Sequence, residues 1–221
     1  MRITLVTPAA PRSRAGNRAT ATRWAGFLRE LGHRVRLVHS DEGAAGAAHP
    51  ADALIALHAW RSAATIAAAA EQQPRRPLLV ALTGTDIYRF QHSHPQTTLD
   101  SMERAHALIG LHDRVADDIP ARFAERLYTV RQSAQPLPAS YGAQPRSVWR
   151  VLVAGHLRDE KDSLRAACAA RDLPAASRIR IVNVGRAHNA EWAAAARAEA
   201  ADNPRFDWRG EVAHWQVRRL M

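Results

Sequence analysis

Basic side chains and a glycine stand together in one short segment that could bind a diphosphate. The apolar run 151–154 leads directly into Gly155, His156, Arg158 and Lys161. Cations placed between a strand and a helix can hold a pyrophosphate and stabilise the negative charge that grows as it departs. We predict that these four residues bind a donor diphosphate, with Arg158 and Lys161 as catalytic cations. The alternative is surface ion pairing with the neighbouring carboxylates Asp159, Glu160 and Asp162.

A second glycine stands where a helix is expected to begin. The loop after the first apolar run ends in Gly16, Asn17 and Arg18. A helix N-terminus has free N–H groups and a partial positive charge, so it attracts anions. We expect Gly16 to let the backbone approach an anionic ligand closely and Arg18 to add positive charge beside it. Asn17 is expected to cap the helix. An ordinary capped loop is the alternative.

Polar side chains also follow two other apolar runs. His58 comes directly after the run 54–57, and Thr85 and Asp86 come shortly after the run 78–82. In open sheets of parallel strands, ligands bind beyond the carboxyl ends of the strands. We therefore predict that His58, Thr85 and Asp86 face a ligand, where the hydroxyl and the carboxylate could hydrogen-bond sugar hydroxyls or orient a nucleophile. The alternatives are a purely structural histidine and a simple turn before the next helix.

These residues must be positioned by strands and helices that alternate along the chain. Short apolar runs are each followed by a longer segment with helical spacing, which is typical of a parallel sheet covered by helices, so the predicted fold class is α/β. In the first helix an apolar face is expected before a stop at Gly32; its members are Ala21, Trp24, Ala25, Leu28 and Leu31. The strands expected in this part are Ile3–Val6, Val35–Val38, Leu54–Leu57, Leu78–Leu82, Leu108–Leu111 and Leu127–Val130.

A stretch rich in Pro and polar residues divides the chain. Residues 135–147 are predicted to be a linker between a domain of residues 1–134 and another of residues 148–221. The second domain should contain strands Val148–Ala154, Ile179–Val184 and Phe206–Trp208, and helices near Ser163–Arg171 and Ala190–Ala201. These few β–α units end in a helical pattern without a stop signal, so we expect the second domain to be incomplete.

Composition limits the classes of function. The net charge is +10, but the 31 basic residues, of which only Lys161 is lysine, are spread along the chain. A solvated Arg-rich surface is therefore favoured over a nucleic-acid-binding module, which remains an alternative. No apolar run is long enough to span a membrane and no secretion signal is visible, so we expect a cytoplasmic protein. Cys168 is expected to be a buried small hydrophobe without a role. No metal-ligand spacing occurs, and no cofactor is expected.

One segment resembles a motif of the GT-B glycosyltransferases related to family 4. The stretch from Gly155 to Lys161 is similar to their Gly-Arg-Leu…Glu-Lys motif, in which the basic residues bind the donor diphosphate. Lys161 matches the motif directly. His156 stands where the motif has arginine, and Arg158 follows two residues later.

Five segments together resemble the selenosugar synthases of selenoneine biosynthesis over essentially the whole chain: GNRATA at 16–21, RW at 23–24, GHRV at 32–35, LTGTD at 82–86 and AGHLR at 154–158. The resemblance implies a GT-B type fold with a Rossmann-like N-terminal domain and the first part of a second Rossmann-like domain. It also implies sugar transfer from UDP-glucose or UDP-N-acetylglucosamine, as co-substrate, to selenophosphate. In such an enzyme Gly16 would lie near the donor diphosphate, and the acceptor side would carry Asn17, Arg18, His58, Thr85 and Asp86. Such enzymes continue with a Glu-Gly-Gly…Glu segment that is not found here, so an inactive truncated remnant is a further alternative.

Overall fold

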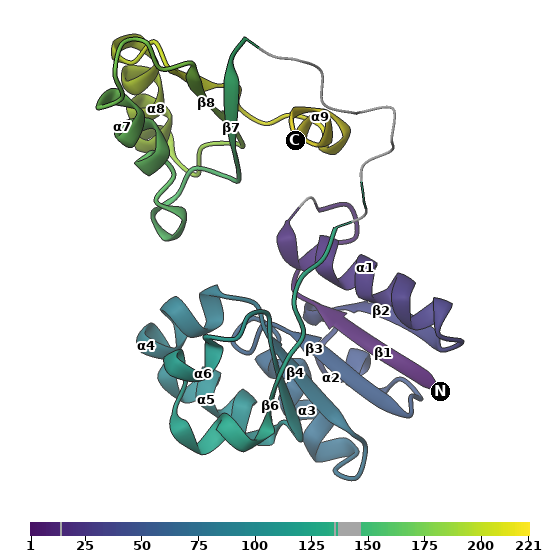
Figure 1. Cartoon of the computed structure of the whole chain (residues 1–221). Coiled ribbons are helices and arrows are strands. Elements are labelled where there is room, and N and C mark those ends of the chain that lie inside the picture. The colour runs from purple at the N-terminus through teal and green to yellow at the C-terminus, as the bar shows by residue number, and fades with distance from the viewer. Residues whose placement is uncertain (14, 135, 137–146) are drawn as a thin grey trace. The chain divides into compact units, whose positions relative to one another are not determined.

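The structure is a computed structural model that describes residues 1–13, 15–134, 136 and 147–221. It divides into two compact units, Met1–Ala134 and Gln135–Met221 (Figure 1). Apart from Pro136 and Ser147, the predicted linker 135–147 lies outside the described residues. Within the described part of the chain, none of the helices has the length and apolar character needed to cross a membrane.

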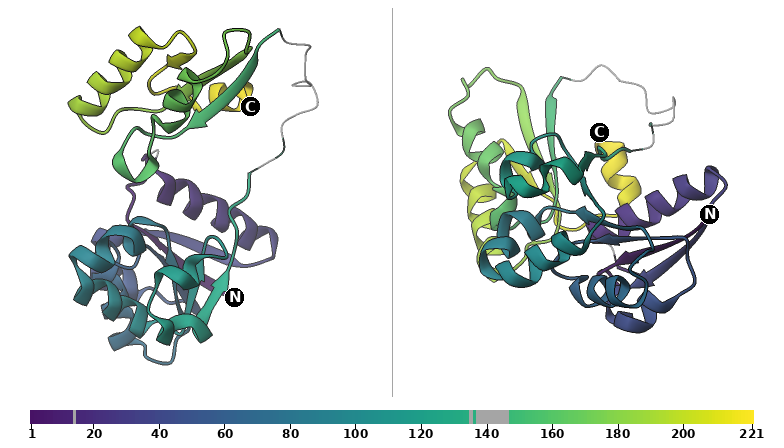
Figure 2. Two further views of the ribbon diagram at one scale, coloured as in Figure 1. Left: turned by 60° about the vertical axis from the view of Figure 1, so that its left-hand side comes forward. Right: turned by 90° about the horizontal axis from the view of Figure 1, so that it is seen from below.

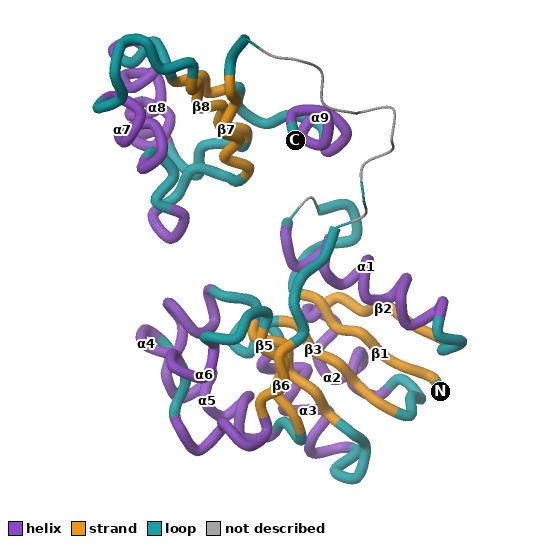
Figure 3. Tube along the Cα trace, in the orientation of Figure 1, coloured by secondary structure: helices purple, strands orange, loops and turns teal. Residues whose placement is uncertain are grey.

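The first unit is built on a six-stranded parallel sheet in the order β2-β1-β3-β4-β5-β6 (Figure 3). Its strands alternate in sequence with helices, as the apolar runs predict. The bounds are β1 Arg2–Thr7, β2 Arg34–His39, β3 Ala53–Leu57, β4 Leu78–Leu82, β5 Ala107–Gly110 and β6 Leu127–Thr129. Each bound lies within one residue of its predicted position, because buried apolar runs bounded by polar residues determine strand ends well.

Helices cover both faces of this sheet. Ala21 and Ala25 of α1 pack on one face, whereas Ile66 of α3 and Met102 of α5 pack on the other. A π-helical turn, η2 (Asp86–Phe90), follows β4. The helices are α1 Gly16–Glu30, α2 Gly43–Ala48, α3 Ala63–Gln72, α4 Gln91–Ser93, α5 Pro95–Arg104 and α6 Val115–Asp118, with short 3₁₀ turns at Ser40–Glu42 and Ala121–Arg126.

Two expectations about the first helix are wrong at its ends. The N-cap residue is Ala15 and the helix begins at Gly16, so Asn17 lies inside the first turn and does not cap it. Leu31 follows the last helical residue, has left the apolar face and is 73% exposed. The predicted stop at Gly32 is confirmed, since this residue has a φ of +83°, which favours glycine.

The second unit contains a three-stranded parallel sheet in the order β7-β8-β9 (Figure 2). The strands are β7 Trp149–Ala154, β8 Ile179–Val184 and β9 Phe206–Trp208, and the helices are α7 Arg165–Arg171, α8 Ala190–Asp202 and α9 His214–Leu220. Ala167 and Ala170 of α7 pack against Ile181 and Phe206 of the sheet. Because those alanines form the buried face of α7, Cys168 is exposed, which corrects the expectation that it is buried.

Candidate functional site

The topology of the first unit brings the predicted acceptor residues to one edge of its sheet. Strands β1, β3 and β4 are neighbours and run parallel, so the loops at their carboxyl ends share that edge. The loop after β1 leads to Gly16, Asn17 and Arg18, the loop after β3 begins with His58, and the loop after β4 contains Thr85. These loops therefore form the ligand-binding edge expected of an open parallel sheet.

Asp86 is the residue that joins two of these loops. Its side chain is fully buried, and its carboxylate accepts hydrogen bonds from four backbone N–H groups at 2.8–3.2 Å, those of Ala59, Thr83, Gly84 and Ile87. A carboxylate engaged in this way holds the loops after β3 and β4 in register. Asp86 therefore positions this edge from within.

His58 is likewise part of the internal structure of this edge. It is 1% exposed and has a φ of 74°, a left-handed conformation that is uncommon outside glycine. Nδ1 accepts a hydrogen bond from the Arg61 N–H at 3.2 Å, and Nε2 lies 2.9 Å from Thr85 Oγ1. Burial lowers the pKa of His58, and this effect and the Arg61 charge outweigh the opposing influence of Asp86. His58 is therefore a neutral, structural imidazole, whereas Thr85 is partly exposed.

An aromatic cluster lies next to His58. The Trp60 ring stacks on Phe90 with 3.9 Å between centroids, and His94 packs 4.8 Å from Trp60. The Arg61 guanidinium carbon lies 5.9 Å from the Trp60 ring centroid and 5.7 Å from that of Phe90, within the range of cation–π attraction. The sequence analysis assigned no role to Phe90 or His94, because only the fold brings η2 and the next turn beside the loop after β3.

The start of α1 leaves its first N–H groups accessible. Ala15, the N-cap residue, makes no side-chain capping bond. Gly16 is exposed, and Asn17 and Arg18 are partly exposed. A Cβ built on Gly16 meets no heavy atom of the described residues within 4 Å, so space for a ligand is available beside the backbone.

At the carboxyl edge of the second sheet, two strand ends approach each other closely. A Cβ added to Gly185, which has a φ of +150°, would lie 1.9 Å from the carbonyl oxygen of Gly155. Beyond these glycines, Leu157 and Ala187 form a parallel bridge. A Cβ on Gly155 meets nothing within 4 Å in the described residues. The sequence analysis missed Gly185, whose only signal was a glycine directly after an apolar strand.

Three predicted diphosphate ligands follow Gly155 at this edge. His156 is exposed, and its Nδ1 accepts the Arg186 N–H at 3.1 Å, so the neutral ring carries its hydrogen on Nε2 as a donor. Arg158 is partly exposed, and Lys161 is exposed at the end of the short 3₁₀ turn Asp159–Lys161. The loop thus presents up to three donors to solvent at the edge where nucleotides bind in such sheets.

The neighbouring carboxylates use only part of this charge. Arg158 Nε lies 3.8 Å from a Glu160 oxygen, and Asp162 pairs with Arg165. Asp159 accepts a hydrogen bond from the indole of Trp192. Within the described residues, Lys161 has no carboxylate partner. The ion-pair alternative therefore describes Arg158 but not Lys161, which stays available to an anion.

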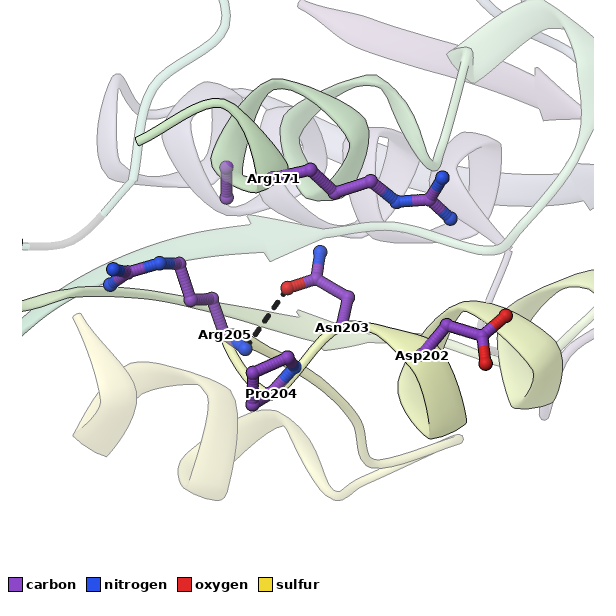
Figure 4. A pocket seen from close by; sticks show the side chains of 6 residues that line it. Arg171, Asp202, Asn203, Pro204 and Arg205 are labelled. Atoms are coloured by element: carbon purple, nitrogen blue, oxygen red, sulfur yellow. Dashed lines mark hydrogen bonds between the residues drawn. The ribbon is translucent and has the colours of Figure 1, made fainter. Parts of the chain in front are cut away.

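A separate pocket lies at the opposite edge of this sheet and is not the predicted donor site. It is lined by Ala170, Arg171, Asp202, Asn203, Pro204 and Arg205, where α7 ends and α8 leads into β9 (Figure 4). Arg171 pairs with the buried Glu199, and Arg205 donates to backbone carbonyls, including that of Pro174 at 2.8 Å. Burial raises the pKa of Glu199, but the hydrogen bonds from Arg171 and Asn203 outweigh it and lower that pKa overall. Arg171 and Arg205 are therefore engaged in interactions that stabilise the fold of the second unit.

Comparison with solved structures identifies the architecture. The chain is similar to Anabaena HepE in complex with UDP-glucose, with a TM-score of 0.66, 13% identity, and coverage of 100% of this chain and 71% of HepE. For the lipopolysaccharide outer core galactosyltransferase WaaB the values are 0.62, 12%, 98% and 70%. For a Listeria monocytogenes structure named as a UDP-N-acetylglucosamine 2-epimerase they are 0.61, 10%, 100% and 71%. No family model and no curated protein sequence matches the chain.

These similarities show the fold. The chain consists of Rossmann-like α/β units of the GT-B type, as its motifs predict. At 10–13% identity they leave the reaction to be argued from the residues at the carboxyl edges of the two sheets.

Proposed function

We propose that this chain is a UDP-sugar-dependent glycosyltransferase that transfers glucose or N-acetylglucosamine to selenophosphate, giving a 1-selenosugar. The observation that carries the proposal is the loop after β7, where Lys161, at the position of the family's motif lysine, is exposed and has no carboxylate partner in the described residues. Similar folds have been solved with UDP-glucose bound, which supports a UDP-sugar donor. The acceptor is inferred from the sequence resemblance to selenosugar synthases.

The loops of the two units have complementary tasks in this proposal. Lys161, Arg158 and the Nε2–H of His156 bind the donor diphosphate, and Arg158 and Lys161 stabilise the charge on UDP as it leaves. Selenium of selenophosphate attacks the anomeric carbon, and the carbon–oxygen bond to UDP breaks with its electron pair going to UDP. The immediate product carries selenium between the anomeric carbon and phosphorus. Water then breaks the selenium–phosphorus bond, which releases phosphate and gives the 1-selenosugar. The selenium is already an anionic nucleophile, so no general base is assigned.

The acceptor belongs to the carboxyl edge of the first unit. Selenophosphate is an anion, and this edge offers the uncapped start of α1, the side chains of Asn17 and Arg18, and the Thr85 hydroxyl. His58 and Asp86 support this edge from within and do not contact the acceptor in the proposal. Gly16 keeps the backbone accessible to an anion.

The direct test is an anaerobic reaction of the chain with selenophosphate and either UDP-glucose or UDP-N-acetylglucosamine, with UDP and selenosugar followed by mass spectrometry. The proposal predicts stoichiometric UDP and a product in which selenium is bonded to the anomeric carbon. A folded chain that binds UDP but gives no product would support the inactive remnant. A chain that ignores UDP but binds RNA with an affinity that falls steeply with salt would support the nucleic-acid-binding alternative.

A further inference from the structure

The hydrogen bond between His58 and Thr85 has a defined direction. Nδ1 of His58 accepts the Arg61 N–H, so it carries no hydrogen of its own in the neutral ring. The ring hydrogen is then on Nε2, which lies 2.9 Å from Thr85 Oγ1. Nε2 must donate and the Thr85 oxygen must accept, so the hydroxyl hydrogen of Thr85 is left to point elsewhere.

Within the described residues, the Thr85 hydroxyl makes no second hydrogen bond. Thr85 is partly exposed at the carboxyl edge of the sheet, and the hydroxyl of Thr83 in the same loop is buried without a partner. Arg61 is exposed nearby, and its charge contributes to the lowered pKa of His58. A hydroxyl with a free hydrogen recognises an acceptor of hydrogen bonds, and the positive charge of Arg61 on the same loop as His58 favours an acceptor that carries negative charge.

The local structure is built to maintain this direction. His58 has a φ of 74° and is 1% exposed, so the chain tolerates an uncommon backbone conformation to place this imidazole. The Asp86 carboxylate fixes both loops through the N–H groups of Ala59 and Thr83. Neither His58 nor Asp86 is available to a ligand, yet both determine where the Thr85 oxygen lies.

We infer that His58 is a positioning residue that makes the Thr85 hydroxyl an obligate donor to an oxyanion of phosphate type. The inference deepens the proposed function by naming the group that recognises the acceptor. It also stands apart from sugar transfer, because the anion site lies within the first unit and can be occupied without UDP.

Two substitutions separate positioning from binding. His58→Asn keeps an oxygen that can accept the Arg61 N–H, and asparagine tolerates a positive φ well, but it removes the donor to Thr85. Thr85→Val keeps the shape and removes the hydroxyl, and Thr85→Ser is the control that keeps it. The probe is thiophosphate, a stable relative of selenophosphate, with binding measured by calorimetry on the whole chain without UDP.

The wild type and Thr85→Ser should bind thiophosphate with similar affinity, and His58→Asn and Thr85→Val should each weaken binding about tenfold. The double variant should be no weaker than Thr85→Val alone, because His58 acts through that hydroxyl. Additive losses, an unaffected His58→Asn variant or a wild type that does not bind thiophosphate would each overturn the inference. In the transfer reaction, His58→Asn should raise the KM for selenophosphate and leave the KM for the UDP-sugar unchanged.

Failure of this inference and failure of the proposed function are distinguishable. If thiophosphate binds as described but no selenosugar forms, the anion site stands and the proposed reaction falls. If selenosugar forms and His58→Asn leaves the KM for selenophosphate unchanged, the reaction stands and the role of His58 falls. Detection of the Nε2–H form of His58 by nitrogen NMR tests the hydrogen-bond direction without any ligand.

Discussion

The carboxyl edges of the two sheets are organised in opposite ways. In the first unit, two of the five polar side chains selected from the sequence face inward, with Asp86 fully buried and His58 1% exposed, whereas Asn17, Arg18 and Thr85 are partly exposed. In the second unit, His156 and Lys161 are exposed, and the constraint is the close approach of the Gly155 backbone to Gly185, which leaves no room for a Cβ. The comparison shows that buried polar side chains shape the edge of the first sheet. Glycines shape the edge of the second sheet and leave its cations accessible to a ligand.

The largest loss of stability is expected at Gly185 in the second unit, where there is no room for a side chain. Gly185→Ala should reduce the free energy of unfolding of the second unit by about 4 kcal/mol, because the new Cβ would meet the Gly155 carbonyl and the left-handed φ is unfavourable for alanine. Gly155→Ala is the matched control, since its Cβ has open space, and it should leave folding nearly unchanged. Denaturant unfolding measures both. Equal stabilities of the two variants would contradict the contact.

The corresponding substitution in the first unit removes the carboxylate of Asp86. Asp86→Ala removes the carboxylate that accepts hydrogen bonds from four backbone N–H groups and should lower the free energy of unfolding by about 3 kcal/mol, although the Ile87 N–H keeps the Gly84 carbonyl as an acceptor. Asp100→Ala, at an exposed position of the same unit, should change the free energy of unfolding by less than about 0.5 kcal/mol. Chemical denaturation compares the pair. A loss below 1 kcal/mol for Asp86→Ala, by the same scale, would mean that water replaces the carboxylate.

The sequence predicted the ends of the strands and of the first helix better than the direction in which the polar side chains at these edges point. Strand bounds and the stop at Gly32 follow from local apolar patterns and backbone preference, so a single sequence contains them. The direction in which a polar residue points after a strand depends on partners far away in the chain. Asp86 binds the N–H of Ala59, and Gly185 faces Gly155, and neither pair is adjacent in sequence. Asn17 lies inside the first turn of α1 instead of capping it, and Cys168 is exposed instead of buried. In a helix, a difference of one position along the chain is enough to change a side chain's role.

A smaller effect concerns the pH dependence of the first unit. Burial lowers the pKa of His58 in the folded chain, whereas the unfolded chain has the ordinary value of about 6.5. Between these two values the unfolded chain binds more protons, so stability falls as the pH drops below about 6.5 and is fully present above it. His58→Asn should remove this component. Denaturant titrations of both proteins between neutral and acidic pH measure the difference, and parallel curves would contradict a buried neutral imidazole.

The smallest effect is expected at Cys168. This thiol is exposed on α7, so Cys168→Ser should change the free energy of unfolding by less than about 0.5 kcal/mol. A thiol reagent should label the native wild type at a rate close to that of the denatured chain. Protection that is lost only on unfolding would place the side chain in the core after all.

The central claim is that the exposed cations of the second edge bind the donor nucleotide. Calorimetric titration of the whole chain with UDP tests it, using Lys161→Ala and, as control, Arg178→Ala, which removes an exposed cation next to the amino end of β8. The account predicts that Lys161→Ala weakens UDP binding about tenfold or more. Arg178→Ala should bind UDP as the wild type does. Unchanged affinity in Lys161→Ala, or an equal loss in both variants, would contradict the claim.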